Sequence, residues 1–361
     1  MRIWIWLAGV STLLYLGFWP TPIEPTDWQA PINKGYVKEF SSNTQLQALE
    51  LFQLDNTAGP EGLALGANGV IFISSEEGWI LRHNPQTGIS KRWVNTGGRP
   101  LGMAFDQHQN LLIADAYRGL LSITPSGTID VLADTVNGVK ISFADDVDVA
   151  SDGRVYFSDA SSKFGAQAYG GTYAASLLDT MEHGGHGRVL VYNPTDRSTA
   201  VLLDGLNFAN GVAVDAGSRF LLVAETGHYR IKKYWLSGPN QGKTEILIDN
   251  LPGFPDNIVR GRNGRFWVGL VAPRNKLLDS MSNTPWLRKV VQRLPEPLRP
   301  KIVNHGHLFT IDGEGENIYS LQDPSGSYHA VTGAIETQQW LYISSLLEDK
   351  LARLDRATLK L

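Results

Sequence analysis

A short triplet that recurs along the chain constrains the fold more than any other feature. Its six copies are centred on Glu61, Leu101, Asp145, Asn210, Asp256 and Thr332. The central positions are separated by 40, 44, 65, 46 and 76 residues, and each copy opens a unit of short apolar runs divided by turns. A repeat of about 40 residues with about four strands is typical of a propeller, and insertions lengthen single copies. The sequence therefore predicts an all-β, six-bladed β-propeller with four-stranded blades.

The two ends of the repeat region predict how the ring closes. The last repeat supplies only three strands before Leu361, whereas residues 46–54 form an extra alternating run ahead of the first repeat. We expect residues 46–54 to pair with the strand near residues 350–354, because this removes the last open sheet edge. A two-sheet sandwich is the alternative fold, but it does not account for the periodic triplet.

The N-terminal segment is uniformly apolar. Residues 3–20 carry no charge and have Trp near both ends, and their 18 residues are just long enough for a membrane-spanning helix. We predict a membrane anchor over residues 1–20, a linker over residues 21–45 and the propeller over residues 46–361, outside the cytoplasm. The alternative is a signal peptide that is cleaved to release a secreted protein, although no small-x-small cleavage site follows.

Composition excludes several classes of function. The chain has 32 Lys and Arg against 36 Asp and Glu, a net charge of −4, and no basic stripe, so no nucleic-acid partner is expected. The absence of cysteine excludes disulfides, zinc–thiolate sites and cysteine nucleophiles. No serine-hydrolase elbow surrounds any serine, so a Ser/His/Asp triad is not supported either.

The central residues of the triplets instead indicate hard-oxygen chemistry. Each triplet begins the innermost strand of its blade, so its central side chain can face the channel. Glu61, Asp145 and Asp256 would be costly to ionise together there unless a cation neutralised them. With Asn210 they form a ligand set that suits Ca²⁺, and Mg²⁺ less well. We predict these four residues as metal ligands.

Two residues that directly follow predicted ligands are expected to support them. Asn257 and Asp146 occupy the third position of their triplets and could hold the ligands through hydrogen bonds. The alternative is that the whole set consists of turn residues, since Asp and Asn commonly occupy strand ends. Carboxylate or amide side chains at four of the six central positions favour the metal site.

Two insertions are expected to lie near the channel mouth. The insertion at residues 275–300 contains an amphipathic helix with Trp286, Leu287, Val290, Val291 and Leu294 on one face and Arg288, Lys289 and Arg293 on the other. This helix would lie on a membrane surface or, as most amphipathic helices do, pack over the propeller mouth. The insertion of the third repeat carries His183 and His186, which we predict as pocket residues; His329 precedes the last repeat.

Several motifs resemble the strictosidine synthase-like family. They are Gly98-Arg99-Pro100-Leu101-Gly102, Ile113-Ala114-Asp115-Ala116-Tyr117-Arg118-Gly119-Leu120, Val155-Tyr156-Phe157-Ser158-Asp159 and Leu251-Pro252-Gly253-Phe254-Pro255-Asp256-Asn257-Ile258. The resemblance extends from Pro60 to the C-terminus and is greatest to the membrane-anchored adipocyte plasma membrane-associated proteins. It implies a propeller related to gluconolactonases, regucalcin and paraoxonases.

The resemblance also implies a channel Ca²⁺ held by a Glu, two Asn or Asp residues and an Asp, which coincide with the four predicted ligands. Thr332 stands where the plant synthase has a catalytic glutamate, so strictosidine formation is not expected; Glu336 lies four residues on. Leu101 stands where paraoxonases have a histidine. Leu101 and Thr332 are therefore predicted as substrate-pocket positions.

These observations predict a calcium-dependent hydrolase of small lactones or aryl esters. The cation would polarise the substrate carbonyl, and Asp256 would act as the nucleophile or as a base towards water. The alternative is a non-catalytic propeller that binds a ligand or a protein and holds calcium for stability only. An enzyme requires an accessible channel mouth, whereas in a scaffold the two insertions would fill it.

Overall fold

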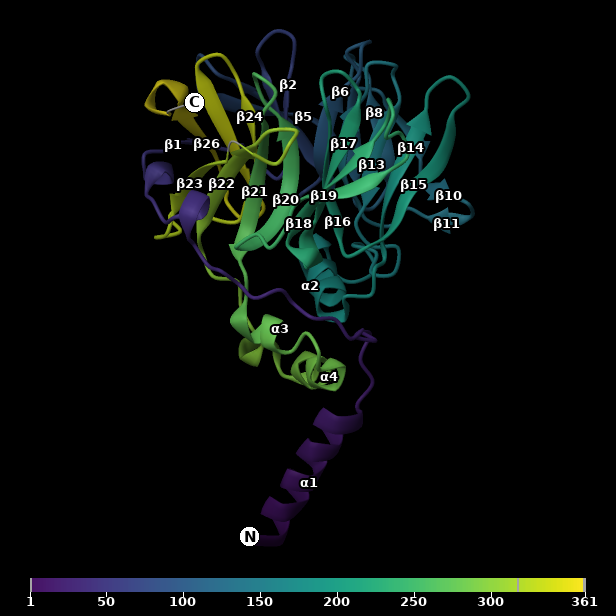
Figure 1. Ribbon diagram of the computed structural model, residues 1–361, viewed down its shortest axis with the longest axis vertical. Coiled ribbons are helices and arrows are strands. Elements are labelled where there is room, and N and C mark those ends of the chain that lie inside the picture. Colours follow the sequence, from purple (N-terminus) through teal and green to yellow (C-terminus); the bar gives the residue numbers. More distant parts are fainter. Residues whose placement is uncertain (1, 317, 360–361) are drawn as a thin grey trace.

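The computed structural model describes residues 2–316 and 318–359, whose strands form a ring of six four-stranded antiparallel sheets (Figure 1). The first three blades are β2–β5 (Leu63–Leu65, Ile71–Ser74, Trp79–Asn84, Ile89–Asn95), β6–β9 (Pro100–Phe105, Leu111–Asp115, Gly119–Ile123, Ile129–Ala133) and β12–β15 (Ala144–Val149, Val155–Asp159, Gly187–Asn193, Ser198–Leu206). The others are β16–β19 (Ala209–Val214, Phe220–Glu225, Arg230–Trp235, Thr244–Ile248), β20–β23 (Gly253–Arg260, Phe266–Pro273, Gly306–Ile311, Tyr319–Asp323) and β24–β26 with β1 (Val331–Glu336, Trp340–Ser345, Lys350–Asp355, Glu50–Gln53). The predicted six-bladed propeller is confirmed.

The ring closes as predicted, with strands from both ends of the propeller region in one blade. β1 pairs antiparallel with β26, from Glu50 opposite Arg353 to Gln53 opposite Lys350. The Arg353 guanidinium also donates to the Glu50 carboxylate at 2.8 Å. The strand is shorter than expected, because residues 45–47 form a turn of 3₁₀ helix that buries Leu46 in the core of this blade. β1 thus supplies the fourth strand of the last blade, and β26 is not left as its edge.

The triplets lie at bulges, which explains their recurrence. In five innermost strands the pairing register shifts at the triplet, for example between Pro100 and Met103 and between Ala209 and Val212. A bulge turns one side chain out of the regular alternation. Glycine follows in several copies because neighbouring blades approach closely there: a Cβ on Gly62 would lie 2.0 Å from the Leu101 carbonyl oxygen.

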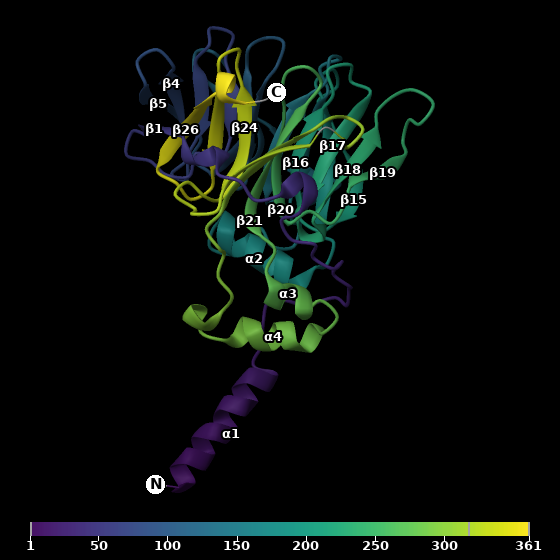
Figure 2. The ribbon, with the colours of Figure 1, turned by 60° about the vertical axis from the view of Figure 1, so that its left-hand side comes forward.

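Both insertions lie at one end of the propeller (Figure 2). α2 (Thr172–Glu182) belongs to the insertion between β13 and β14, and α3 (Lys276–Ser280) and α4 (Pro285–Arg293) belong to the insertion between β21 and β22. The remaining elements are α1 (Arg2–Phe18), the β10–β11 hairpin (Thr135–Val136, Val139–Lys140) and the 3₁₀ turns Lys38–Phe40, Gln45–Gln47, Thr226–His228, Glu296–Leu298 and Arg356–Thr358. α1 extends away from the propeller at the α4 end.

The orientation of α4 differs from the amphipathic pattern. Arg288, expected on the polar face, is fully buried, whereas Trp286, expected on the apolar face, is 66% exposed. The Arg288 guanidinium donates to the carbonyl oxygens of Met181 and Glu182 at the end of α2. The unpaired carbonyls of the last turn of α2 stabilise a cation, so the arginine packs inward.

The predicted linker is instead bound to the propeller end that carries the insertions. Ile23 is fully buried in a core cluster with α2, and Trp28 stacks on the His183 ring at a centroid distance of 3.8 Å. The backbone amides of Glu24 and Thr26 donate to Glu182. We call residues 21–34 the strap. Its few apolar side chains are buried because the insertions provide a surface for them.

The predicted transmembrane anchor is not confirmed. The segment forms α1, of 17 residues, and no helix within the described residues combines the length and hydropathy needed to cross a bilayer.

The strap predicts different effects for two truncations. Removing residues 1–20 should leave the free energy of unfolding almost unchanged, because it leaves the strap whole. Removing residues 1–26 also deletes Ile23, whose burial is worth about 1.5–3 kcal/mol. Urea unfolding of the two truncated proteins should therefore give a lower midpoint for the shorter one; equal midpoints would contradict a structural role for the strap.

Candidate active site

A cavity of 810 Å³ lies at the insertion end of the channel and contains five of the six triplet side chains. These are Glu61, Leu101, Asp145, Asn210 and Asp256. They come from five different blades, and four of them lie at the bulges of their innermost strands, whereas Glu61 lies just before β2. The cavity extends from this polar floor to walls formed by α2, by α4 and by residues 299–304. The channel mouth is thus covered by the insertions but not filled.

The Glu61 side chain is positioned by a hydrogen bond from Asn257. Asn257 donates its side-chain amide to Glu61 Oε1 at 2.8 Å, whereas Glu61 Oε2 is buried and has no hydrogen-bond partner. Burial raises the pKa of Glu61 to about 7, against the opposing effects of the buried Arg99 guanidinium and the Asn257 hydrogen bond. An ionised Glu61 at neutral pH would therefore be stabilised by a cation placed at Oε2.

For Asp145 and Asp256, as for Glu61, burial disfavours the ionised form. Burial raises the pKa of each well above its usual range, and the nearby Glu61 carboxylate raises it further. Asn210 donates its side-chain amide to Asp256, which opposes this rise, and leaves its own Oδ1 buried without a partner. The three carboxyl groups therefore repel one another across the floor in the absence of a counter-charge.

The donor set matches the chemistry of an oxygen-preferring divalent cation. Glu61 Oε2 and Asn210 Oδ1 are orphaned acceptors beside two carboxylates, and such hard oxygen donors are what Ca²⁺ and Mg²⁺ require. However, within the described residues no three His, Cys, Asp or Glu side chains lie close enough together to constitute a preformed metal cluster. The calcium site therefore stays a prediction, with an amide as one of its four ligands.

The two predicted supporting residues have different surroundings. Asn257 contacts a predicted ligand, Glu61, directly. Asp146 instead accepts backbone hydrogen bonds from Val212 in the next blade at 2.9 Å and from Val147 at 2.8 Å. Asp146 thus links two innermost strands through backbone amides.

The sixth triplet residue is absent from the cavity lining. Thr332 is buried and donates its hydroxyl to the Glu61 backbone carbonyl at 2.7 Å. Glu336 lies at the other end of β24, where its carboxylate contacts Arg356 and accepts from Trp267. Neither side chain therefore brings a carboxylate to the cavity from the last blade.

His183 and His186 are also outside the cavity lining. His183 ends α2 in a left-handed conformation, and its ring lies between Trp28 and His228, with 3.3 Å between the two Nε2 atoms. His186 Nε2 lies 2.5 Å from Glu182 Oε1. Both rings thus face the strap and the loops around α2, a direction that depends on tertiary packing and has no sequence signal.

His329 is the histidine that lines the cavity. Its Nδ1 lies 2.7 Å from Glu348 Oε1, in the loop between β25 and β26. The Glu348 carboxylate accepts a hydrogen bond from the His329 backbone N–H at 3.1 Å, and the ring Nδ1 has no hydrogen-bond partner among the described residues. In the sequence, His329 is distinguished only by its place before the last repeat, because its neighbour Glu348 is 19 residues away in a turn of no recognisable pattern.

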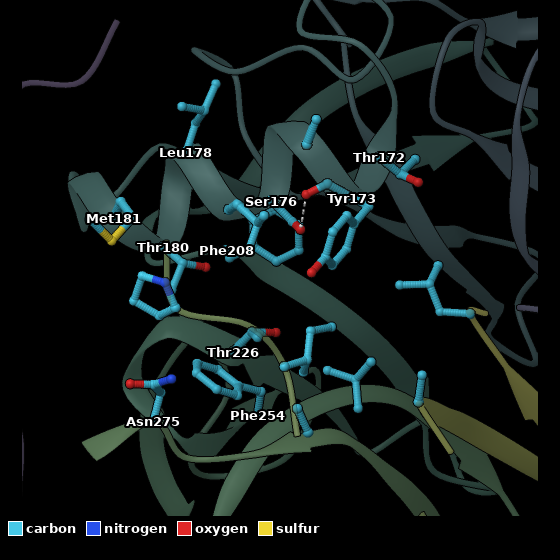
Figure 3. Close-up of a pocket in the computed structure, with 18 of the residues that line it drawn as sticks. Thr172, Tyr173, Ser176, Leu178, Thr180, Met181, Phe208, Thr226, Phe254 and Asn275 are labelled. Atoms are coloured by element: carbon cyan, nitrogen blue, oxygen red, sulfur yellow. Dashed lines mark hydrogen bonds between the residues drawn. The ribbon is translucent and has the colours of Figure 1, made fainter. Parts of the chain in front are cut away.

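The walls of the cavity are mostly apolar (Figure 3). Leu178 and Met181 line the cavity from α2, and Phe254 and Thr226 line it from the opposite side. The remaining apolar lining includes Phe143, Phe208, Val271, Leu278, Val291, Ile302 and Val303. Apolar walls over a few convergent polar groups are typical of sites for small organic molecules, and the volume falls within the usual range of roughly 300–1,000 Å³.

Sequence comparisons relate the chain to proteins of known families. Residues 145–239 match the strictosidine synthase family and residues 39–83 match the N-terminal region of strictosidine synthase-like proteins. Protein strictosidine synthase-like 4 of Arabidopsis thaliana is 33% identical over 303 residues, covering 82% of this chain and 79% of that protein. Adipocyte plasma membrane-associated protein of Salmo salar is 33% identical over 340 residues, covering 88% and 80%.

Solved structures of other proteins superpose on this chain and share its fold. A gluconolactonase from Xanthomonas campestris superposes with a TM-score of 0.62 at 17% identity, covering 85% of this chain and 89% of the other. Regucalcin, a calcium-binding protein from Agrobacterium tumefaciens, superposes with a TM-score of 0.59 at 14% identity, covering 85% and 93%. At these identities the likeness concerns the propeller fold alone.

Proposed function

Because this chain belongs to the strictosidine synthase-like family, we propose that it is a divalent-cation-dependent hydrolase of lactones or aryl esters with an apolar body. One observation carries the proposal: Glu61, Asp145, Asn210 and Asp256 converge on the floor of an 810 Å³ cavity with apolar walls. A gluconolactonase and the calcium-binding protein regucalcin have this fold, which agrees with such chemistry. The space beneath the insertions supports a small-molecule site over a scaffold whose mouth is filled.

The floor residues would divide the work between binding and proton transfer. Glu61, Asp145, Asn210 and Asp256 would hold the cation, with Asn257 orienting Glu61. When bound, a calcium ion supplies Lewis-acid polarisation of the substrate carbonyl. Asp256 accepts the proton of the attacking water at a carboxylate oxygen or attacks the carbonyl carbon as a nucleophile.

The remaining proton carrier is proposed from the cavity wall. Cleavage of an ester or lactone leaves an alkoxide or phenoxide, which must gain a proton. His329 lines the cavity with the Glu348 carboxylate beside it, so its imidazole is suited to supply that proton. Strictosidine formation is not part of the proposal, because the last blade presents Thr332 and no carboxylate to this end of the channel.

We also propose a membrane association for the protein, with the propeller outside the cytoplasm. The apolar α1 and the relatives whose name includes "plasma membrane-associated" support this location.

A substrate screen tests the hydrolase proposal. The purified full-length chain should hydrolyse aryl acetates and γ- or δ-lactones, lose this activity in chelator and regain it with added CaCl₂ more than with MgCl₂. Hydrolysis that is unaffected by chelator would exclude the cation-dependent mechanism. Chelator-sensitive binding without turnover on any ester or lactone would favour the non-catalytic alternative.

A further inference from the structure

Large exposed apolar side chains gather at the end of the propeller where the cavity opens. Trp286 and Leu298, which is 67% exposed, belong to the insertion that carries α4, and Val303 lies beside the cavity at 62% exposed. Leu277 on α3 and Leu177 on α2 are also exposed at this end. Such a grouping of large apolar side chains marks an interaction surface.

This end of the molecule is also the basic part of a chain that is acidic as a whole. Residues 274–301 contain seven Lys and Arg and two Asp and Glu, a net charge of +5, whereas the whole chain has a net charge of −4. Arg274 and Arg288 are buried, and their guanidinium groups donate to backbone carbonyls within the protein. Lys276 and Lys301 are exposed and form no ion pair among the described residues. Free cations thus flank the exposed apolar side chains.

The N-terminal helix is fixed to the same surface. Arg293 at the end of α4 donates to the carbonyl oxygens of Leu16 at 2.8 Å and Trp19 at 2.5 Å. Tyr15 returns a hydrogen bond from its hydroxyl to the Arg293 carbonyl at 3.0 Å. These bonds tie the C-terminal end of α1 to the insertion of the fifth blade, so the exposed apolar side chains of α1 continue the surface.

We propose that this face, formed by α1, α3, α4 and residues 296–303, docks on an anionic lipid surface and that the cavity opens against that surface. Exposed Trp and Leu side chains beside unpaired Lys are the composition of elements that lie in a membrane interface. The unpaired cations favour anionic lipid headgroups over an apolar protein partner. An amphiphilic ligand would then pass from the lipid to the cavity along its apolar walls.

The absence of cysteine allows a direct test on the full-length chain. Leu298→Cys and Leu277→Cys report on the proposed face, and Ile89→Cys reports on the opposite end, since Ile89 begins β5 at the end of its blade away from Glu61. Each variant carries an environment-sensitive fluorophore and is mixed with vesicles whose acyl chains are brominated. We expect vesicles of phosphatidylcholine with phosphatidylserine to quench the labels at 298 and 277 and to leave the label at 89 unchanged.

Reversing the charge of two exposed lysines provides a second test of the proposal. Lys276→Glu with Lys301→Glu should weaken binding to the anionic vesicles about tenfold or more and change little with vesicles of phosphatidylcholine alone. Both lysines are exposed, so the variant should keep the wild-type melting temperature. Vesicle binding without quenching at 298 and 277 would show attachment through α1 only and overturn the proposal. Labels at 298 and 277 that are shielded before vesicles are added would assign the face to a second copy of the chain, which also overturns it.

Discussion

Asp256→Asn is expected to abolish hydrolysis while retaining most of the stabilisation by calcium. An amide oxygen can still ligate a cation, but it cannot take a proton from water or attack a carbonyl carbon. Loss of a base of this kind lowers turnover by roughly 10²–10⁴-fold. The first measurement is the turnover of the best substrate from the screen. It compares wild type and variant in saturating calcium.

The second measurement is the melting temperature with and without calcium. A ligand that binds only the folded protein stabilises it by about 2.7 kcal/mol at a hundredfold excess over its Kd. We expect this gain in wild type and most of it in Asp256→Asn. Glu61→Gln should lose much of both the gain and the activity, because it removes a charge beside the orphaned Oε2 while keeping the side-chain volume.

A matched control separates the site from buried carboxylates in general. Asp159 is fully buried but pairs with Arg188 at 2.8 Å and is not a cavity residue. Asp159→Asn should lower the melting temperature and leave the calcium-dependent increment intact. A wild-type melting temperature that is the same in calcium and in chelator would remove the metal site, and the cation-dependent hydrolase would be excluded with it.

The propeller and the floor of the cavity were predictable because both depend on strict repetition. The central residue of each triplet has an equivalent place at the start of its blade's innermost strand, so the positions of Glu61, Asp145, Asn210 and Asp256 in sequence were sufficient to place them around one axis. The third position of the triplet recurs with the same regularity, but the hydrogen bonds of its side chain differ between blades. Asp146 binds backbone amides of the next blade whereas Asn257 binds Glu61, and this difference depends on blade spacing.

The mouth of the cavity was not predictable in the same way, because the insertions do not repeat. His183 and Trp28 are 155 positions apart and stack only because the strap crosses the end of α2. His329 reaches the cavity beside a carboxylate from another loop. A hydrophobic periodicity describes one helix in isolation, so it assigned Arg288 to solvent without reference to the carbonyl groups that surround it.

Arg288→Met is expected to cause the largest loss of stability of any single change in the insertions. The buried guanidinium donates to four backbone carbonyls: Met181 and Glu182 at the end of α2, Thr26 in the strap and Ser282 before α4. Removing it leaves these acceptors buried without partners, and removing one member of a buried charged network typically costs about 3–5 kcal/mol.

The loss should be concentrated at the mouth of the cavity, since Arg288 joins three segments that the blades do not otherwise hold together. We expect limited proteolysis to cut the variant within residues 275–304 at protease concentrations that leave wild type intact, and urea unfolding to begin earlier. Lys289→Met is the matched control on the same helix: its partner Glu24 has a side chain that is 73% exposed, and exposed ion pairs contribute about 0–1 kcal/mol. Equal protease resistance of the two variants would show that α2, α4 and the strap are held by their apolar contacts, and that the buried arginine is not the element that keeps the cavity covered.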